Sequence, residues 1–318
     1  MAIKDAAQYE VETARSEEMT VDQFIELGLQ EIEALMHRVV ETDVTVLRDA
    51  SHHILAAGGK RIRPRLVLTS YAACGGEDFH QVAAPASALE LVHTASVVHD
   101  DINDHGVLRR GRPSVNAVWG RTFALLTGDF LFTKVYELMA PYKDLNIVLA
   151  DATVALVEGE TLQASAVKDN NLSRKTYMDI IARKTAALFQ AGGVMGARLA
   201  NGTEQQVEAL GKFGFNIGLA FQIVDDILDL VGDSTTIGKV AGLDREQGKG
   251  LSAAYAAEKD SPIDVIQRKL LEGNAIEEGR QQALNLVQMA ISELNVLPDN
   301  AGKQALIALA RSTVERAY

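Results

Sequence analysis

The sequence predicts an all-α protein that folds as one large domain. All six prolines lie outside residues 142–261, so the strongest helix breaker is absent from a long stretch of the chain. Apolar residues recur at helical spacing in several segments, whereas the alternating pattern of a β-strand is hard to find anywhere. No low-complexity linker divides the chain. We therefore expect one helical domain over residues 21–318, preceded by a mobile acidic N-terminus at residues 1–20.

The first clearly bounded helix is predicted around residues 85–106. Pro85 fits the first turn of a helix, where its missing N–H is not needed, and Gly106 is the predicted end. Residues 146–167 and 177–199 repeat the helical pattern of apolar residues. These segments predict a succession of long helices.

A further helix begins at a capping box formed by Thr203 and Gln206. Apolar residues then recur every three or four positions up to Val231, and Gly232 is the predicted end. This helix and the one after Pro85 each carry an acidic triplet close to their predicted C-terminal ends.

The composition excludes several classes of function. The chain of 318 residues has 31 Lys and Arg against 43 Asp and Glu, a net charge of −12, which argues against non-specific nucleic-acid binding. An apolar fraction of 47% is enough for a large buried core. The single cysteine, Cys74, cannot form a disulfide within the chain, which fits a reducing cytoplasm.

No segment predicts export or membrane insertion. The polar, acidic start of the chain lacks the basic and apolar regions of a secretory signal. The longest uncharged stretches, residues 185–197 and 213–224, are shorter than the roughly 18 residues of a transmembrane helix. We therefore expect a cytoplasmic protein without a transmembrane segment.

Two segments share the acidic pattern DDxxD, at residues 100–104 and 225–229. Side chains four positions apart lie on one face of a helix, so Asp100 pairs with Asp104, and Asp225 pairs with Asp229. Most charge runs are solvated faces, but here the like charges repel, the predicted helix ends disfavour anions, and the preceding residues are strongly apolar. Carboxylates completed by water and substrate phosphate are typical Mg²⁺ ligands. We interpret both segments as metal-binding faces.

Basic residues offer the positive charge that a bound phosphate needs. Residues 60–65 carry four cations behind a glycine pair, residues 109–112 carry three, and a dispersed set contains Arg183, Lys184, Lys239 and Lys249. Alone, each set is more often a solvated loop than a site. Together with two carboxylate faces, they predict a diphosphate bound among metal ions and guanidinium groups.

These motifs resemble those of the trans-isoprenyl diphosphate synthases, the polyprenyl synthetase family. The shared motifs are GGKxxRP at 58–64, DDxxD and RRGRP at 100–113, GD at 128–129, GExxQ at 159–163, KT at 184–185, FQxxDDxxD at 221–229, and GKxAGxD with a later GK at 238–249. One departure is Gly-Leu-Ser at 250–252, where many members have Thr-Leu-Pro. The resemblance implies an all-α bundle around a deep central cavity, usually as a homodimer.

The resemblance also implies a reaction, in which an allylic diphosphate condenses with isopentenyl diphosphate to an all-trans polyprenyl diphosphate. Mg²⁺, three ions per active site with substrate bound, would be held by Asp100, Asp104 and Asp225, supported by Asp101, Asp226 and Asp229. The allylic diphosphate would contact Arg109, Lys184 and Lys239, with Lys249 as a further substrate-binding residue. Isopentenyl diphosphate would contact Gly59, Lys60, Arg63, His93 and Arg110. Thr185 and Gln222 would lie near the developing carbocation.

Product length is expected to depend on the residues four and five positions before Asp100. These are Ser96 and Ala95, about 6 to 7.5 Å deeper along the helix. Short-chain members of the family tend to carry aromatic residues there. We expect a product longer than geranylgeranyl diphosphate, with a farnesyl or geranylgeranyl diphosphate synthase as the alternative.

Other interpretations of the residues remain to be tested. His93 could be a core histidine, and Gln163 could be a packing hydrogen-bond donor. A class I terpene cyclase also uses DDxxD, and a subunit without catalytic activity would keep the fold. The motifs Glu77-x-x-His80 and Glu90-x-x-His93 could suggest a carboxylate bundle that binds iron, although Pro85 leaves too little chain between them for two facing helices.

Overall fold

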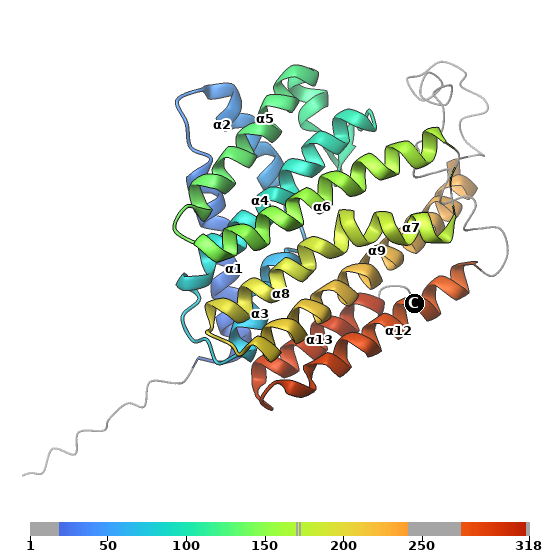
Figure 1. Cartoon of the computed structure of the whole chain (residues 1–318). Helices are drawn as coiled ribbons and strands as arrows, with labels where there is room; N and C mark the ends of the chain where they lie inside the picture. Colours follow the sequence, from blue (N-terminus) through green and yellow to red (C-terminus); the bar gives the residue numbers. More distant parts are fainter. Residues whose placement is uncertain (1–18, 170, 172, 241–274, 316–318) are drawn as a thin grey trace, which may run out of the picture.

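The computed structural model describes residues 19–169, 171, 173–240 and 275–315, with side chains in the last part of the helix that ends at Val240 left out from residue 229 onward. The expected mobile N-terminus therefore lies almost entirely outside the described residues. The elements confirm an all-α protein (Figure 1). In chain order they are α1 (Val21–Val39), α2 (Thr45–Ala56), α3 (Ile62–Ala73), α4 (His80–Asn103), β1 (Leu108–Arg109), β2 (Arg112–Pro113), α5 (Val115–Met139), α6 (Lys143–Lys168), α7 (Arg174–Ile181), α8 (Ala187–Leu199), α9 (Glu204–Val240), α12 (Ala275–Glu293) and α13 (Ala301–Glu315).

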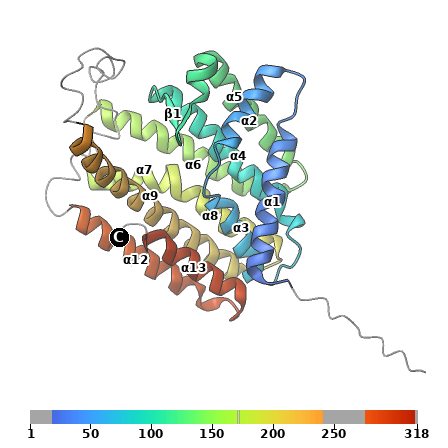
Figure 2. The ribbon, with the colours of Figure 1, turned by 180° about the vertical axis from the view of Figure 1, so that it is seen from behind.

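The helices pack around two groups of buried apolar side chains. One group joins α1, α2, α4, α5 and α6, and the other joins α9, α12 and α13, while α3 and α8 contribute side chains to both. Figure 2 shows α9, α12 and α13 together on one side of the molecule, and α1, α2 and α5 on the other. Helices α4 and α9, which carry the two acidic segments, are thereby brought to opposite walls of one cavity.

Capping boxes occur at two helix starts, and the one at α9 confirms the prediction. At α9, Gln206 N donates to Thr203 Oγ1 at 3.3 Å and Thr203 N donates to Gln206 Oε1 at 2.8 Å. The same reciprocal pair joins Thr20 and Gln23 at the start of α1. Each capping box satisfies N–H groups that a helix start would otherwise leave unpaired.

Two predicted helix boundaries are wrong. Helix α4 begins at His80 and contains Pro85 in its interior. The cost of a proline there, about 3 kcal/mol, is outweighed by the burial of most residues of α4. Helix α9 continues past Gly232 to Val240, because one glycine within a helix costs only about 1 kcal/mol relative to alanine. The second acidic segment is therefore inside a helix rather than at its end.

The end of α4 and the turn after it depend on left-handed residues. The helix ends at Asn103, and His105 adopts φ 53°, so Gly106 N can donate to Asp101 O at 2.9 Å, as in a Schellman motif. A short β1–β2 hairpin follows, which the sequence pattern did not predict. Its two turn residues, Arg110 and Gly111, both have positive φ, as in a type I′ turn.

A segment of π-helix joins α7 to α8 at Ala182–Ala186 and contains the Lys184-Thr185 pair. It approaches α6 closely, because a Cβ added to Gly159 would lie 2.5 Å from the backbone nitrogen of Lys184. Only glycine fits at this contact. π-Helical turns are rare and frequently occur at functional sites. No helix among the described residues is long and apolar enough to cross a membrane.

Candidate active site

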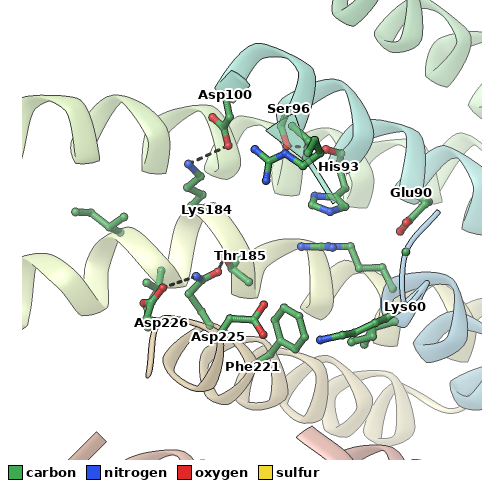
Figure 3. Close-up of a pocket in the computed structure, with 18 of the residues that line it drawn as sticks. Lys60, Glu90, His93, Ser96, Asp100, Lys184, Thr185, Phe221, Asp225 and Asp226 are labelled. Atoms are coloured by element: carbon green, nitrogen blue, oxygen red, sulfur yellow. Dashed lines mark hydrogen bonds and ion pairs between the residues drawn. The ribbon is translucent and has the colours of Figure 1, made fainter. Parts of the chain in front are cut away.

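A cavity of about 670 Å³ lies between α4 and α9 and is lined by many of the residues that the sequence singled out. The predicted residues that line it are Gly59, Lys60, Arg63, His93, Ser96, Asp100, Asp104, Arg109, Arg110, Gln163, Lys184, Thr185, Gln222, Asp225 and Asp226. Figure 3 shows Asp100 on one wall and Asp225 and Asp226 on the opposite wall. Tertiary structure thus brings together two acidic segments that are far apart in the sequence.

The first acidic wall combines several carboxyl groups with one lysine. Lys184 Nζ lies 3.2 Å from Asp100 Oδ2 and 3.3 Å from Gln163 Oε1. Burial and the neighbouring Asp100 raise the pKa of Asp104. Burial and Asp100 likewise raise the pKa of Glu160 to about 7. The raised pKa values show that negative charge is crowded on this wall.

Asp101 points away from the cavity. Its side chain is 2% exposed and accepts a hydrogen bond from Arg109 Nε at 3.0 Å. Burial raises the pKa of Asp101, and the hydrogen bond from Arg109 opposes that rise. In this arrangement Asp101 orients Arg109, which itself lines the cavity.

The second acidic wall is held by a chain of hydrogen bonds. Thr185 Oγ1 donates to Gln222 Oε1 at 2.7 Å, and Gln222 Nε2 donates to Asp226 Oδ1 at 2.9 Å. Tyr177 Oη donates to Asp226 Oδ2 at 2.6 Å. Burial and the adjacent carboxylate raise the pKa of Tyr177, so this phenol remains a donor. The chain fixes the side chains of Thr185 and Gln222 at the cavity surface.

A cationic end of the cavity is formed by the glycine-rich loop at residues 58–61, the first turn of α3 and the β1–β2 hairpin. Lys60 Nζ lies 6.0 Å from the centre of the Phe221 ring, and the Arg63 guanidinium lies 5.0 Å from the centre of the Phe189 ring. Burial lowers the pKa of Arg63 from its ordinary value. A Cβ on Gly59 would lie 2.5 Å from Arg110 Nη1, so the end of the Arg110 side chain packs closely against this loop.

His93 lies within the same cationic group, two turns before Asp100 on α4. Burial and the positive charge of Arg63 hold the pKa of His93 well below its usual value. A neutral imidazole offers both a donor and an acceptor. Because His80 and His93 both lie on α4, the facing-helix iron site considered above is excluded.

The cavity residues fit a hard divalent cation. Their donors are carboxylate oxygens with repelling charges, and Lys184 already supplies a positive charge to Asp100. Within the described part of the chain, no three such side chains converge on one point to enclose an ion alone. Mg²⁺ sites use one or two carboxylates and complete the coordination with water and phosphate.

Some predicted residues are not placed at the cavity. Ala95 is fully buried in the core and is not among the lining residues, whereas Ser96 lines the cavity and donates to His93 O at 2.8 Å. The side chains of Asp229 and Lys239, and the whole of Lys249, lie outside the described residues.

The sequence interpretation missed two cavity residues that carry interactions. Tyr177 lies seven positions before Lys184, so helical spacing could have placed both on one face. Glu90 accepts a hydrogen bond from Arg61 Nη1 at 3.0 Å, and its other oxygen is buried with no hydrogen-bond partner among the described residues. The sequence named Glu90 only within the motif Glu90-x-x-His93, and its pairing with Arg61 was not predicted because the two residues are 29 positions apart.

The fold and the facing carboxylate walls are those of an all-α protein with one large polar cavity, as in an enzyme that uses divalent cations. The sequence pattern of one family, described as polyprenyl synthetase, matches residues 44–287. The chain therefore belongs to the polyprenyl synthetase family and is a trans-prenyltransferase of isoprenoid biosynthesis.

Known relatives are similar over nearly their whole length. The octaprenyl diphosphate synthase of Haemophilus influenzae is 34% identical, over 94% of this chain and 98% of the relative. A short chain isoprenyl diphosphate synthase of Methanothermobacter thermautotrophicus is 36% identical, over 87% and 92%. The crystal structure of a polyprenyl synthase from Caulobacter crescentus, complexed with calcium and isoprenyl diphosphate, has a TM-score of 0.78 and 31% identity, over 95% and 99% of the two chains.

Proposed function

We propose that this chain is a Mg²⁺-dependent polyprenyl diphosphate synthase that condenses an allylic diphosphate with isopentenyl diphosphate. The observation that carries the proposal is the division of one cavity into two acidic walls and a separate cationic end. Two diphosphates could bind at these two places with their hydrocarbon parts between them. The calcium and isoprenyl diphosphate named for the Caulobacter crescentus structure support a divalent cation and a prenyl substrate here.

The acidic walls would bind the allylic diphosphate through cations. Asp100, Asp104 and Asp225 would hold Mg²⁺, which as a Lewis acid stabilises the departing pyrophosphate. Asp226 and Asp229 would support the second wall, and Asp101 would act through Arg109. Lys184 would exchange its contact with Asp100 for the diphosphate, together with Arg109, Lys239 and Lys249.

The cationic end would bind isopentenyl diphosphate. Lys60, Arg63 and Arg110 would contact its phosphates, and neutral His93 would add a hydrogen bond. The oxygen atoms of Thr185 and Gln222 would face the developing positive charge, because their hydrogen-bond chain fixes them at the cavity surface. No side chain is required as a strong base, since the released pyrophosphate can accept the proton.

The proposal is tested by incubating the protein with farnesyl diphosphate and radiolabelled isopentenyl diphosphate. Lipid-soluble product should form with Mg²⁺ and disappear when EDTA is added. Cyclic hydrocarbon from farnesyl diphosphate alone would instead indicate a terpene cyclase. If no lipid-soluble product forms from the two diphosphates in the presence of Mg²⁺, the proposed reaction is wrong.

We further propose a product longer than geranylgeranyl diphosphate. The relatives include both an octaprenyl and a short-chain synthase, so support comes from the cavity. Ser96 offers only a small hydroxymethyl group at the cavity wall. Ala95 is buried behind that wall, so a ring there would narrow the cavity only by displacing its neighbours.

A homodimer is the assembly that we propose. Helices α5 and α6 expose large apolar side chains, which are Val118, Phe123, Leu125, Leu126, Tyr136, Ile147, Val154 and Val157. Exposed apolar surface of this kind is typical of protein interfaces. Light scattering after gel filtration should give twice the mass of the chain, and Tyr136→Glu with Ile147→Glu should shift it towards the monomer. The cytoplasm remains the expected location, in agreement with the free thiol of Cys74.

A further inference from the structure

Arg61 differs from the other cations of the glycine-rich loop because protein groups engage its guanidinium. Nε and Nη2 donate to the two oxygens of Glu33, each at 2.8 Å, and Nη1 donates to Glu90 at 3.0 Å. Nη2 also donates to Leu55 O at 3.2 Å. The Arg61 side chain is only 13% exposed. Because all three nitrogens of this guanidinium already donate hydrogen bonds, it has little capacity left to bind a phosphate.

The neighbouring cations are arranged in the opposite way. Among the described residues, no carboxylate lies within ion-pair distance of Lys60, Arg63 or Arg110, and Arg63 Nε has no hydrogen-bond partner. Figure 3 shows Lys60 reaching towards Phe221 at the cavity surface. These three cations are thus available to a diphosphate, whereas the guanidinium between them in sequence is not.

The backbone at Arg61 explains why its side chain must be held. Its φ of 47° and ψ of 40° are left-handed, which costs a non-glycine residue about 1–2 kcal/mol. Arg61 caps α3, so its backbone sets the direction of Lys60 before it and of Arg63 in the first turn after it. A strained conformation persists where surrounding contacts impose it. The contacts here come from Glu33 on α1 and Glu90 on α4.

We propose that Glu33 is a positioning residue for isopentenyl diphosphate, an inference that rests on the proposed function. Glu33 does not line the cavity and acts through Arg61. It holds the strained loop so that Lys60 and Arg63 present their charges to one diphosphate. Its loss should therefore weaken binding of isopentenyl diphosphate and leave the allylic diphosphate, at the acidic walls, unaffected.

The chain offers a matched control for this proposal. Arg65 Nη2 donates to Glu26 Oε1 at 2.8 Å, so a second carboxylate of α1 pairs with a second arginine of the same basic cluster. This pair lies at the surface, with the Glu26 side chain 60% exposed, and neither residue lines the cavity. Glu26→Gln removes the same kind of charge pair between the same two helices without touching the strained residue.

The experiment compares Glu33→Gln, Arg61→Lys and Glu26→Gln by steady-state kinetics, by calorimetric titration with isopentenyl diphosphate alone, and by Tm. Glu33→Gln should raise both the KM and the Kd for isopentenyl diphosphate about tenfold. Its kcat and its KM for farnesyl diphosphate should stay within about twofold of the parent. Arg61→Lys keeps the positive charge but cannot donate to both oxygens of Glu33, so it should behave like Glu33→Gln. Glu26→Gln should change none of these values.

Lys60→Ala separates failure of this inference from failure of the proposed function. Loss of a charge-assisted phosphate contact should raise the KM for isopentenyl diphosphate about a hundredfold. If Lys60→Ala has no such effect, the proposed location of isopentenyl diphosphate is wrong. If it has the effect but Glu33→Gln does not, the positioning role is overturned. Equal increases in both KM values with a large fall in Tm would also overturn it, because they would indicate a purely structural role.

Discussion

Asp100 and Asp225 are the single residues on which the proposed chemistry depends most. Replacing either one with Ala should lower turnover by about a thousandfold, because stabilisation of the departing pyrophosphate would be lost. The Tm in EDTA should change by only a few degrees, since removing one of several repelling carboxylates offsets the loss of local contacts. Product formation and thermal melts measure both effects. Asp151→Ala, on the exposed side of α6, is the control. Normal turnover in Asp100→Ala would contradict the metal assignment.

Glu160 provides a prediction about pH. Burial and Asp100 raise its pKa to about 7 from an ordinary value of 4.5, so the folded state binds a proton that the unfolded state has lost in this range. Stability of the metal-free protein is therefore reduced by this group as pH rises from about 4.5 through 7. Glu160→Gln should raise the free energy of unfolding at pH 8 by about 1–2 kcal/mol and give no gain at pH 4. Urea unfolding in EDTA at both pH values tests this prediction. An equal gain in stability at pH 4 would show that the gain does not come from the raised pKa of Glu160.

At the scale of elements, the close approach of α6 to the π-helical segment controls Lys184 and Thr185. Gly159→Ala should destabilise the protein by about 1–3 kcal/mol and lower kcat, because its Cβ would overlap the backbone at Lys184. Urea unfolding measures the change in stability, and steady-state kinetics with both substrates measures the change in kcat. The control is Gly279→Ala on α12, whose Cβ would meet side-chain atoms and no backbone, the nearest being Ile227 Cδ1 at 3.2 Å. Full kcat in Gly159→Ala would show that this contact does not position Lys184.

Local sequence signals for helix starts and ends were correct at some elements and wrong at others. The capping box at Thr203 sets the start of α9, because its hydrogen bonds are made within one turn. Pro85 and Gly232 did not end helices, because their local costs are a few kcal/mol at most and burial along α4 exceeds that cost. The π-helical segment could not be recognised from the spacing of apolar residues, since it shifts the register of the helix by only a single residue.

For the whole molecule, the cavity between α4 and α9 should determine product length. Ser96 lies one turn, about 6 Å, from Asp100 along α4. Ser96→Phe should shorten the product to farnesyl or geranylgeranyl diphosphate, because the ring would occupy the cavity beside the growing chain. Chromatography of dephosphorylated products gives the length, and Ser96→Ala should leave it unchanged. A product of unaltered length from a well-folded Ser96→Phe would place the floor of the cavity elsewhere.

The sequence by itself determined the helical class, both acidic segments and most cationic residues of the cavity. It could do so because helical periodicity and motif spacing are local properties, expressed within a few turns of chain. Only the tertiary structure decided that Asp101 turns away to Arg109, that Tyr177 donates to Asp226, and that Arg61, at the cavity surface, is already held by Glu33. These outcomes depend on which helices meet and at what distance. That choice follows from burial of the whole apolar surface, and no short segment of the sequence contains it.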